Sequence, residues 1–254
     1  MTSHAPASPL LQTIGLSKSF GGLAAVRDVS ITLAQGELHA VIGPNGAGKS
    51  TLVNLLAGAI LPTSGRILLG RHDVSQRPEH ERAHLGLARS FQRTNILPSL
   101  SVLENVRLAV QAVSLGRYGL LASPERARPL LEQAQAALER AGLTYGHGRA
   151  AGTLAHGQQR QLEIAMALAA RPKVLLMDEP LAGMGAEEGE RMAALLKSLA
   201  AEHALLLIEH DMDFVFAVAD RLTVLVEGAV TASGRPQDVR LDPEVQAAYL
   251  GGHA

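Results

Sequence analysis

The run from Gly43 to Thr51 combines residue types and spacing that suit phosphate binding. It reads Gly-Pro-Asn-Gly-Ala-Gly-Lys-Ser-Thr and fits the pattern G-x-x-x-x-G-K-[ST], with Gly43, Gly48, Lys49 and Ser50 in the fixed places. Glycines let successive backbone N–H groups turn inward around phosphate oxygens. The lysine adds positive charge for the β- and γ-phosphates, and the serine hydroxyl can ligate Mg²⁺. We predict that this run binds a nucleotide through Gly43, Pro44, Asn45, Gly46, Ala47, Gly48, Lys49, Ser50 and Thr51.

The segments on either side favour a phosphate site over a simple glycine-rich turn. Residues 37–42 form an apolar stretch that is typical of a buried strand leading into the loop. After the loop, Leu52, Leu55 and Leu56 recur at helical spacing. A helix that begins there directs the positive end of its dipole at bound phosphates.

Two further apolar segments each end in residues that are suited to catalysis. Residues 174–177 lead to Asp178 and Glu179, and residues 204–208 lead to His210. The carboxyl ends of parallel strands are where an α/β sheet places its ligand chemistry. We expect Asp178 to hold Mg²⁺ through water and Glu179 to polarise an attacking water. A plain acidic strand end before a proline turn is the structural alternative.

Composition limits the classes of protein that need to be considered. The chain has 254 residues, of which 47% are hydrophobic and 19% charged, and its net charge is -1. These values fit a folded globular chain and argue against a nucleic-acid partner held by bulk positive charge. The absence of cysteine excludes disulfides and thiolate metal sites. We expect neither a signal peptide nor a membrane-spanning segment.

The surrounding segments predict an α/β nucleotide-binding core. Residues 10–16 and 23–33 resemble strands of an antiparallel layer, and the apolar strands 174–177 and 204–208 suit a parallel sheet. Between approximately 85 and 158 the pattern is helical, with a capping box at Ser101 and Glu104. We therefore expect a disordered N-terminus at 1–9 and one domain at 10–254 with an inserted α-helical subdomain.

Taken together, these motifs resemble those of ABC-transporter ATPase subunits. In chain order they are the Walker A loop at Gly43–Thr51, the Q-loop glutamine Gln92, a signature sequence at 154–158, the Walker B carboxylates and the switch histidine His210. Gln92 and His210 carry little information alone, since most glutamines lie on surfaces and a single histidine is usually structural. The resemblance spans about Leu10 to Gly251. It implies a P-loop NTPase (RecA-like) core with an N-terminal antiparallel β layer and an inserted α-helical subdomain.

The resemblance also implies a mechanism and partners. Two ATPase subunits, identical or different, would sandwich ATP head to tail, with Ser50, Gln92 and Asp178 around Mg²⁺ and with Glu179, His210, Lys49 and Gln92 as catalytic residues. Phe20 stands where the family places a ring against adenine, although a core role is equally compatible. The signature residues Ala155, Gly157 and Gln158 would face the partner's ATP. Two permeases and, indirectly, a periplasmic binding protein complete such systems at the cytoplasmic face of the bacterial inner membrane.

Two positions depart from the family pattern. Ala155 replaces the usual signature serine, which removes a hydrogen bond worth about 1 kcal/mol. Gly185 stands in place of the usual D-loop aspartate, so communication through that carboxylate is in doubt. The remaining catalytic residues are present, and we expect hydrolysis.

Several stretches resemble the larger ATPase of branched-chain (hydrophobic) amino-acid importers. They are Ala88–Gln92, His156–Ala165, Ile208–Met212, the ending at Ala247–Gly251 and the insertion around 116–128. Related systems carry urea, amides or aromatic acids, and lipopolysaccharide exporters share much of this pattern. These remain alternatives.

A rival from another enzyme class is a zinc peptidase. His80-Glu81-Arg82-Ala83-His84 matches H-E-x-x-H, and both histidines would share one face of a helix. A third ligand at a defined spacing is not evident, which argues against zinc chemistry.

Overall fold

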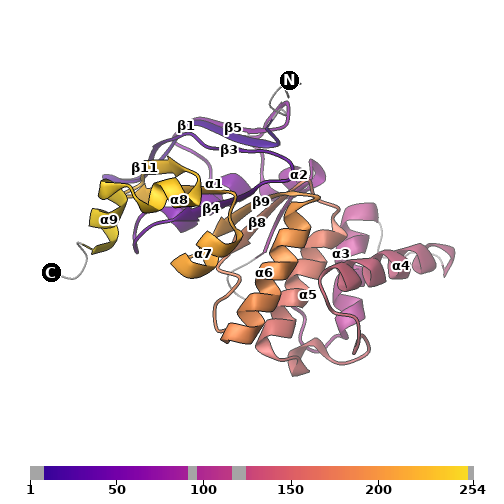
Figure 1. Ribbon diagram of the computed structural model, residues 1–254. Helices are drawn as coiled ribbons and strands as arrows, with labels where there is room; N and C mark the ends of the chain where they lie inside the picture. The colour runs from indigo at the N-terminus through magenta and orange to yellow at the C-terminus, as the bar shows by residue number, and fades with distance from the viewer. Residues whose placement is uncertain (1–8, 91–95, 116–123, 251–254) are drawn as a thin grey trace, which may run out of the picture.

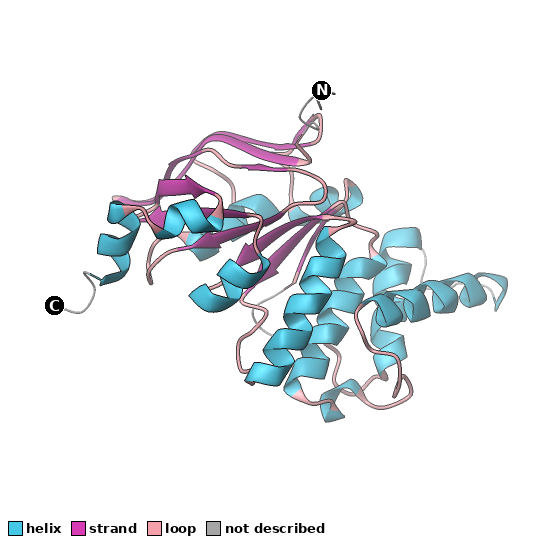
Figure 2. Ribbon diagram, in the orientation of Figure 1, coloured by secondary structure: helices cyan, strands magenta, loops and turns pink. Residues whose placement is uncertain are grey.

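The protein has an antiparallel β layer above a mainly parallel sheet, with helices around the sheet and to one side of it (Figures 1 and 2). The computed structural model describes residues 9–90, 96–115 and 124–250. No helix in this described part combines the length and apolar character that a membrane span requires.

The antiparallel layer is built around β1, which pairs with three other strands. Its strand order is β2-β1-β5-β6, and β3 also pairs with β1. The strands are β1 (Leu11–Phe20), β2 (Leu23–Val29), β3 (Thr32–Leu33), β5 (Ser64–Leu69) and β6 (His72–Asp73). This confirms the predicted antiparallel layer. The predicted strand at 23–33 is in fact two strands, because residues 30 and 31 leave the ladder.

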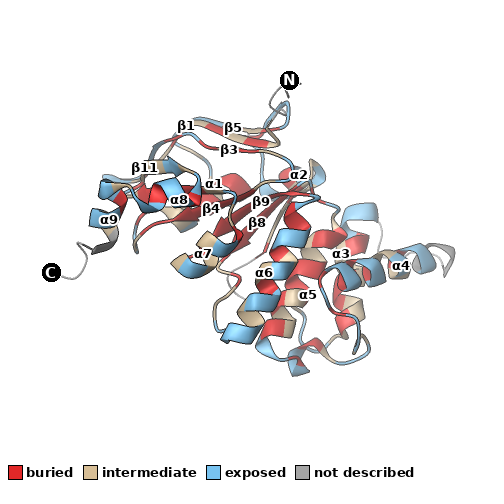
Figure 3. Ribbon diagram, in the orientation of Figure 1, coloured by how far each residue is buried: buried red, intermediate tan, exposed pale blue. Residues whose placement is uncertain are grey.

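The second sheet has the order β11-β10-β4-β9-β8-β7 among the described strands. Neighbouring strands from β10 to β7 are parallel, and β11 pairs antiparallel with β10. The strands are β4 (Leu38–Ile42), β7 (Leu87–Arg89), β8 (Val174–Asp178), β9 (Ala204–Ile208), β10 (Arg221–Val226) and β11 (Ala229–Gly234). β4, β8 and β9 are buried along their whole length (Figure 3). Continuous apolar runs have this placement because both faces of such a sheet are covered.

The helices divide between the sheet and a group beside it. Contacts join α3, α4 and α5 into that group, and α6 lies next to α5 in Figure 1. The boundaries that we expect for a helical subdomain, 85 and 158, stay a prediction. The helices are α1 (Lys49–Ala57), α2 (Glu79–His84), α3 (Val102–Leu115), α4 (Pro124–Arg140), α5 (His156–Ala169), α6 (Ala186–Ala200), α7 (Met212–Val218), α8 (Pro236–Arg240) and α9 (Pro243–Leu250).

Local signals account for several of these helix ends. The backbone N–H of Glu104 donates to the Ser101 hydroxyl at 3.1 Å, as predicted for the start of α3, while the Glu104 carboxylate accepts from Arg107. α1 ends at Ala57 and is capped by Gly58, whose φ of 88° is the left-handed value that favours glycine. The Arg82 guanidinium also donates to the Leu55 and Leu56 carbonyls in the last turn of α1. A cation at this end is favourable for the helix dipole.

Candidate nucleotide-hydrolysis site

The phosphate loop connects β4 to α1, and neighbouring backbone explains its fixed glycines. A Cβ on Gly43 would lie 2.2 Å from the Leu225 carbonyl oxygen, and one on Gly48 would lie 2.3 Å from that of Ala25. Gly48 also has a φ of 96°. Both positions therefore exclude larger residues.

A tight turn from the C-terminal half of the chain holds this loop in place. The Gly228 N–H donates to the Ala47 carbonyl at 3.0 Å, and the Gly228 carbonyl accepts from the Arg27 N–H at 2.7 Å. Glu227 and Gly228, with φ values of 47° and 82°, form the hairpin turn between β10 and β11. Arg27 reinforces the junction through an ion pair with Glu227 at 3.6 Å. The phosphate loop, β2 and the hairpin thus meet at one point.

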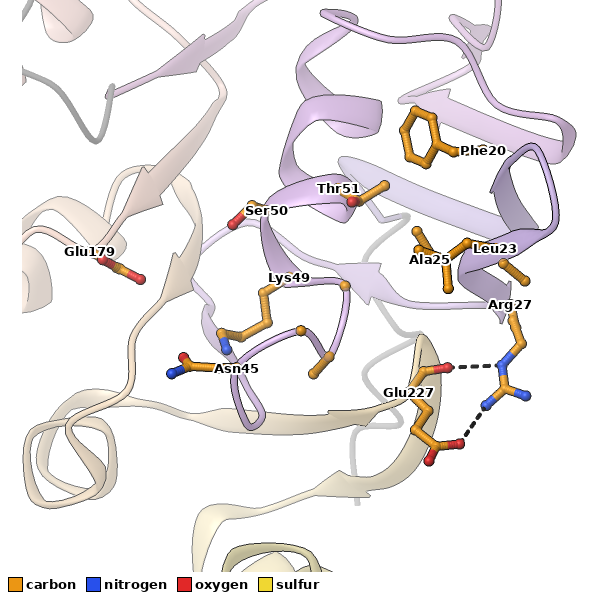
Figure 4. A pocket seen from close by; sticks show the side chains of 14 residues that line it. Phe20, Leu23, Ala25, Arg27, Asn45, Lys49, Ser50, Thr51, Glu179 and Glu227 are labelled. Carbon is orange, nitrogen blue, oxygen red and sulfur yellow. Dashed lines mark hydrogen bonds and ion pairs between the residues drawn. The ribbon is translucent and has the colours of Figure 1, made fainter. Parts of the chain in front are cut away.

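A cavity of about 680 Å³ opens over the phosphate loop. In Figure 4, Glu179 faces the loop from one side, while Phe20 lies on the other. Phe20 is 49% exposed, and the Lys18 ammonium lies 5.0 Å from the centroid of its ring. An exposed ring at a cavity mouth is available for stacking, whereas a core ring would be covered. The lining residues include Phe20, Asn45, Gly46, Lys49, Ser50 and Glu179.

The Lys49 amine bonds to its own loop. It donates to the carbonyl oxygens of Gly43 at 2.6 Å and Pro44 at 3.0 Å. Burial lowers the pKa of Lys49, while the charges of Glu179 and Asp178 act in the opposite direction. Lys49 thus lines the cavity close to two carboxylates that favour its charged form.

The carboxylates after β8 lie in different environments. Asp178 is buried, with its side chain 4% exposed, and its Oδ2 accepts from Arg89 at 3.0 Å. Glu179 is partly buried at the cavity, with a φ of 47° that is unusual for a residue with a side chain. Strained backbone of this kind clusters at functional sites.

The carboxylate that follows β9 fixes the adjacent turns. Glu209 is 0% exposed, and it accepts from the backbone N–H groups of Leu181 at 3.0 Å and His210 at 3.1 Å. Burial raises the pKa of Glu209, and these two hydrogen bonds oppose the shift. The His210 side chain is 69% exposed. Glu209 thus ties the chain after β8 to the chain after β9.

The predicted signature residues line a different cavity, of about 370 Å³, at the start of α5. Ala155 is the N-cap of α5 and provides no side-chain cap, while its N–H donates to the Gln158 side chain at 3.3 Å. Gly157 is buried, and a Cβ there would lie 2.6 Å from a carboxylate oxygen of Glu188. The first N–H groups of a helix have no partner within the helix, so this end can accept an anion.

Comparison with known proteins identifies the family. The ABC transporter family model matches residues 26–182. The chain belongs to the ABC transporter family as an ATP-hydrolysing subunit. A second model, described as branched-chain amino acid ATP-binding cassette transporter, matches residues 232–254.

Individual relatives of this ABC ATPase match almost end to end. The chain is 39% identical to the high-affinity branched-chain amino acid transport ATP-binding protein BraF of Pseudomonas aeruginosa, over 96% of this chain and 98% of the relative. It is 40% identical to LivG of Escherichia coli K12, a protein of the same description, with the same coverage.

Solved structures of cassettes from ABC transporters share the fold. One in its ADP conformation superposes with a TM-score of 0.84 and 32% identity, over 96% of this chain and 99% of that one. A dimeric bacterial cassette superposes with a TM-score of 0.75 and 25% identity, over 89% and 98% respectively. The expected α/β fold of an ABC ATPase is confirmed.

The donor set of this ABC ATPase fits Mg²⁺ better than zinc. Ser50 is exposed and lines the cavity over the phosphate loop. Asp178, which directly precedes Glu179 in the sequence, supplies a buried carboxylate. Hard oxygen donors of this kind suit Mg²⁺. His80 and His84, by contrast, are exposed on the short α2, and the described residues contain no group of three or more His, Asp or Glu side chains that could hold a metal.

Several of the residues expected to bind nucleotide line one cavity, while their roles stay predictions. Gln92 lies outside the described residues, so its place stays a prediction. The sequence does not predict two contacts. One joins Arg27 to Glu227 at the cavity, and the other joins Arg89 to Asp178. Their partners lie 200 and 89 residues away in the chain, respectively. The only local signal is that each is a charged residue in or next to a strand.

Proposed function

We propose that this ABC ATPase powers the import of branched-chain or other hydrophobic amino acids. The observation that supports hydrolysis is the single cavity that joins the phosphate loop, the exposed Phe20 ring and Glu179. The names of the relatives and the match at 232–254 support the class of solute.

In the proposed mechanism, the chain's own groups bind the phosphates and move one proton. The Lys49 amine leaves the Gly43 and Pro44 carbonyls and pairs with the β- and γ-phosphates, where a positive charge stabilises the transferred group. Ser50, Gln92 and Asp178 would hold Mg²⁺, which would supply positive charge against the phosphate oxygens. Glu179 accepts a proton from the attacking water while the water oxygen bonds to the γ-phosphorus. The bond between the γ-phosphorus and the β,γ-bridging oxygen breaks, and ADP leaves with that oxygen. His210 contacts the γ-phosphate from the end of β9.

The signature end of α5 would complete the site of a second subunit. Ala155, Gly157 and Gln158 line their own cavity, and a helix N-terminus suits the γ-phosphate of a facing subunit. A solved dimeric cassette supports a pair of this kind. The pair, made of identical or different ATPases, would bind two permeases at the cytoplasmic face of the inner membrane, and these would receive solute from a periplasmic binding protein.

Glu179→Gln tests the mechanism, because the amide cannot accept the proton yet keeps the shape of the side chain. In complexes purified with the native membrane subunits, we expect ATP turnover to fall by about a hundredfold or more while ATP still binds. Glu187→Gln, on the exposed first turn of α6, is the matched control. Unchanged turnover in Glu179→Gln contradicts the assignment.

The solute is tested separately with the same complexes in liposomes. ATP-driven uptake of labelled leucine, in the presence of the co-purified binding protein, supports amino-acid import. Uptake of urea, amides or aromatic acids without leucine uptake would replace this solute class, and co-purification of an envelope bridge would indicate export.

A further inference from the structure

Arg89 forms an ion pair with the Asp178 carboxylate, which the proposed Mg²⁺ site would require. Its Nη2 donates to the Asp178 Oδ2 at 3.0 Å, and its Nη1 donates to the Asn54 side-chain oxygen at 2.6 Å. The two charged side chains are only 11% and 4% exposed. One guanidinium therefore joins the end of β8 to α1, the helix that begins in the phosphate loop.

The position of the Asp178 backbone is fixed independently of this ion pair. β8 lies between β9 and β7 in the sheet, with Asp178 opposite Ile208. The Asp178 N–H also lies 3.4 Å from the Ser90 hydroxyl. Removal of the guanidinium would thus leave the Asp178 carboxylate close to its place without the positive charge of Arg89, while the more distant charge of Lys49 remains.

Electrostatics then gives the sign of the effect on metal binding. A positive charge in contact with a buried carboxylate repels a divalent cation at the same carboxylate, and the repulsion is strong where water is largely excluded. We propose that Arg89 is a positioning residue that competes with Mg²⁺ for Asp178, so that the metal site forms only when a nucleotide supplies further ligands. This inference rests on the proposed role of Asp178 as a metal-binding residue.

The test uses nucleotide-free full-length protein and a readout other than turnover. Mn²⁺, a spectroscopic substitute for Mg²⁺, is titrated while the free ion is followed by electron paramagnetic resonance. We expect Arg89→Met to bind Mn²⁺ at least about tenfold more tightly than the original chain, because the apolar side chain has similar length and no charge. Arg89→Lys is expected to fall between them, since one ammonium cannot bridge Asn54 and Asp178 as the planar fork does.

Thermal unfolding provides a matched control for the loss of a buried ion pair. Arg160 and Glu163 on α5 form a comparable pair at 2.8 Å, with side chains 6% and 5% exposed. Arg89→Met and Arg160→Met should both lower the unfolding midpoint without metal. Only Arg89→Met should regain stability on addition of MgCl₂. Equal Mn²⁺ affinity in Arg89→Met and the original chain overturns the proposal; if Arg89→Met does not fold, equal affinity in Arg89→Gln, which is also uncharged, overturns it instead.

A further variant separates this proposal from the proposed function. Asp178→Asn should weaken Mn²⁺ binding in the presence of ATP. If it does not, the metal role of Asp178 fails. If it does, but Arg89→Met leaves nucleotide-free binding unchanged, only the competition by Arg89 fails.

Discussion

Replacement of Arg82 by methionine is expected to lower the free energy of unfolding by about 3 kcal/mol. Arg82 is 0% exposed. Its guanidinium donates to the Leu55 carbonyl at 2.6 Å and the Leu56 carbonyl at 2.8 Å, at the end of α1. It also donates to the carbonyls of Arg77 at 2.9 Å and Ser75 at 3.3 Å. One side chain thus joins α1 to the segment before α2.

The magnitude follows from two opposing effects. A hydrogen bond from a charged donor contributes about 1.5–3 kcal/mol, so the two short bonds to α1 account for about 3–6 kcal/mol. Burial also lowers the pKa of Arg82 to about 10, which shows that the charged form is costly to bury. Relief of that cost offsets about 3 kcal/mol. At the middle of that range the two short bonds leave about 1.5 kcal/mol after this offset, and the two longer bonds, at the ordinary contribution of a hydrogen bond, add about 1–2 kcal/mol, so a net loss of about 3 kcal/mol is expected.

Urea denaturation measures this change directly. We expect a lower midpoint for Arg82→Met with an unchanged slope, because the surface exposed on unfolding stays the same. Arg77→Met is the matched control: its ion pair with Glu81 is 3.6 Å long and about half exposed, so a loss of no more than about 0.5 kcal/mol is expected. A loss below about 1 kcal/mol for Arg82→Met would refute the reasoning.

Three other predictions concern protonation and backbone space. Burial lowers the pKa of His39 from 6.5 to about 4, so the unfolded chain binds a proton before the folded chain does as the pH falls. Between about pH 6.5 and 4 the protein should therefore lose up to about 3 kcal/mol of stability. His39→Gln should flatten this part of the stability profile, measured by urea denaturation at each pH. Gly48→Ala should weaken ATP binding by at least about a hundredfold, measured by titration with a fluorescent nucleotide, because the added methyl group would meet the Ala25 carbonyl. Gly46 has a φ of 80° but open space around it, so Gly46→Ala should lose less ATP affinity. Glu227→Ala should change the unfolding free energy by less than about 1 kcal/mol in a chemical-denaturation assay, since its pair with Arg27 is largely exposed.

Local pattern was sufficient for the buried strands and the phosphate loop. β8 and β9 are continuous apolar runs, and the spacing of the glycines before Lys49 is typical of a loop that binds nucleotide phosphates. The first turns of α6 (Ala186–Ala200), by contrast, give a weak helical signal in the sequence. Gly189 interrupts the helical pattern at its start, and glycine is a poor helix former, so the sequence understated this element.

Other elements depend on contacts that a linear pattern does not contain. α7 was missed because Met-Asp-Phe-Val-Phe-Ala-Val is rich in β-branched and aromatic residues, which favour strands. Its start is fixed by Asp211, whose carboxylate accepts from the Phe214 N–H at 3.0 Å. Similarly, the H-E-x-x-H pattern draws attention to two histidines that are exposed. The buried residue of this segment is Arg82, which lies between them in the sequence.

The position of β4 in the sheet has a consequence for biosynthesis. β4 carries the phosphate loop, yet its two neighbours are β9 and β10, which the ribosome makes more than 150 residues later. The hairpin turn that bonds to Ala47 comes later still. A nascent chain that ends before β9 therefore has the complete loop sequence without the strands that shape it. Pairing at such long sequence separation is slow, so nucleotide affinity should develop only after most of the chain has left the exit tunnel.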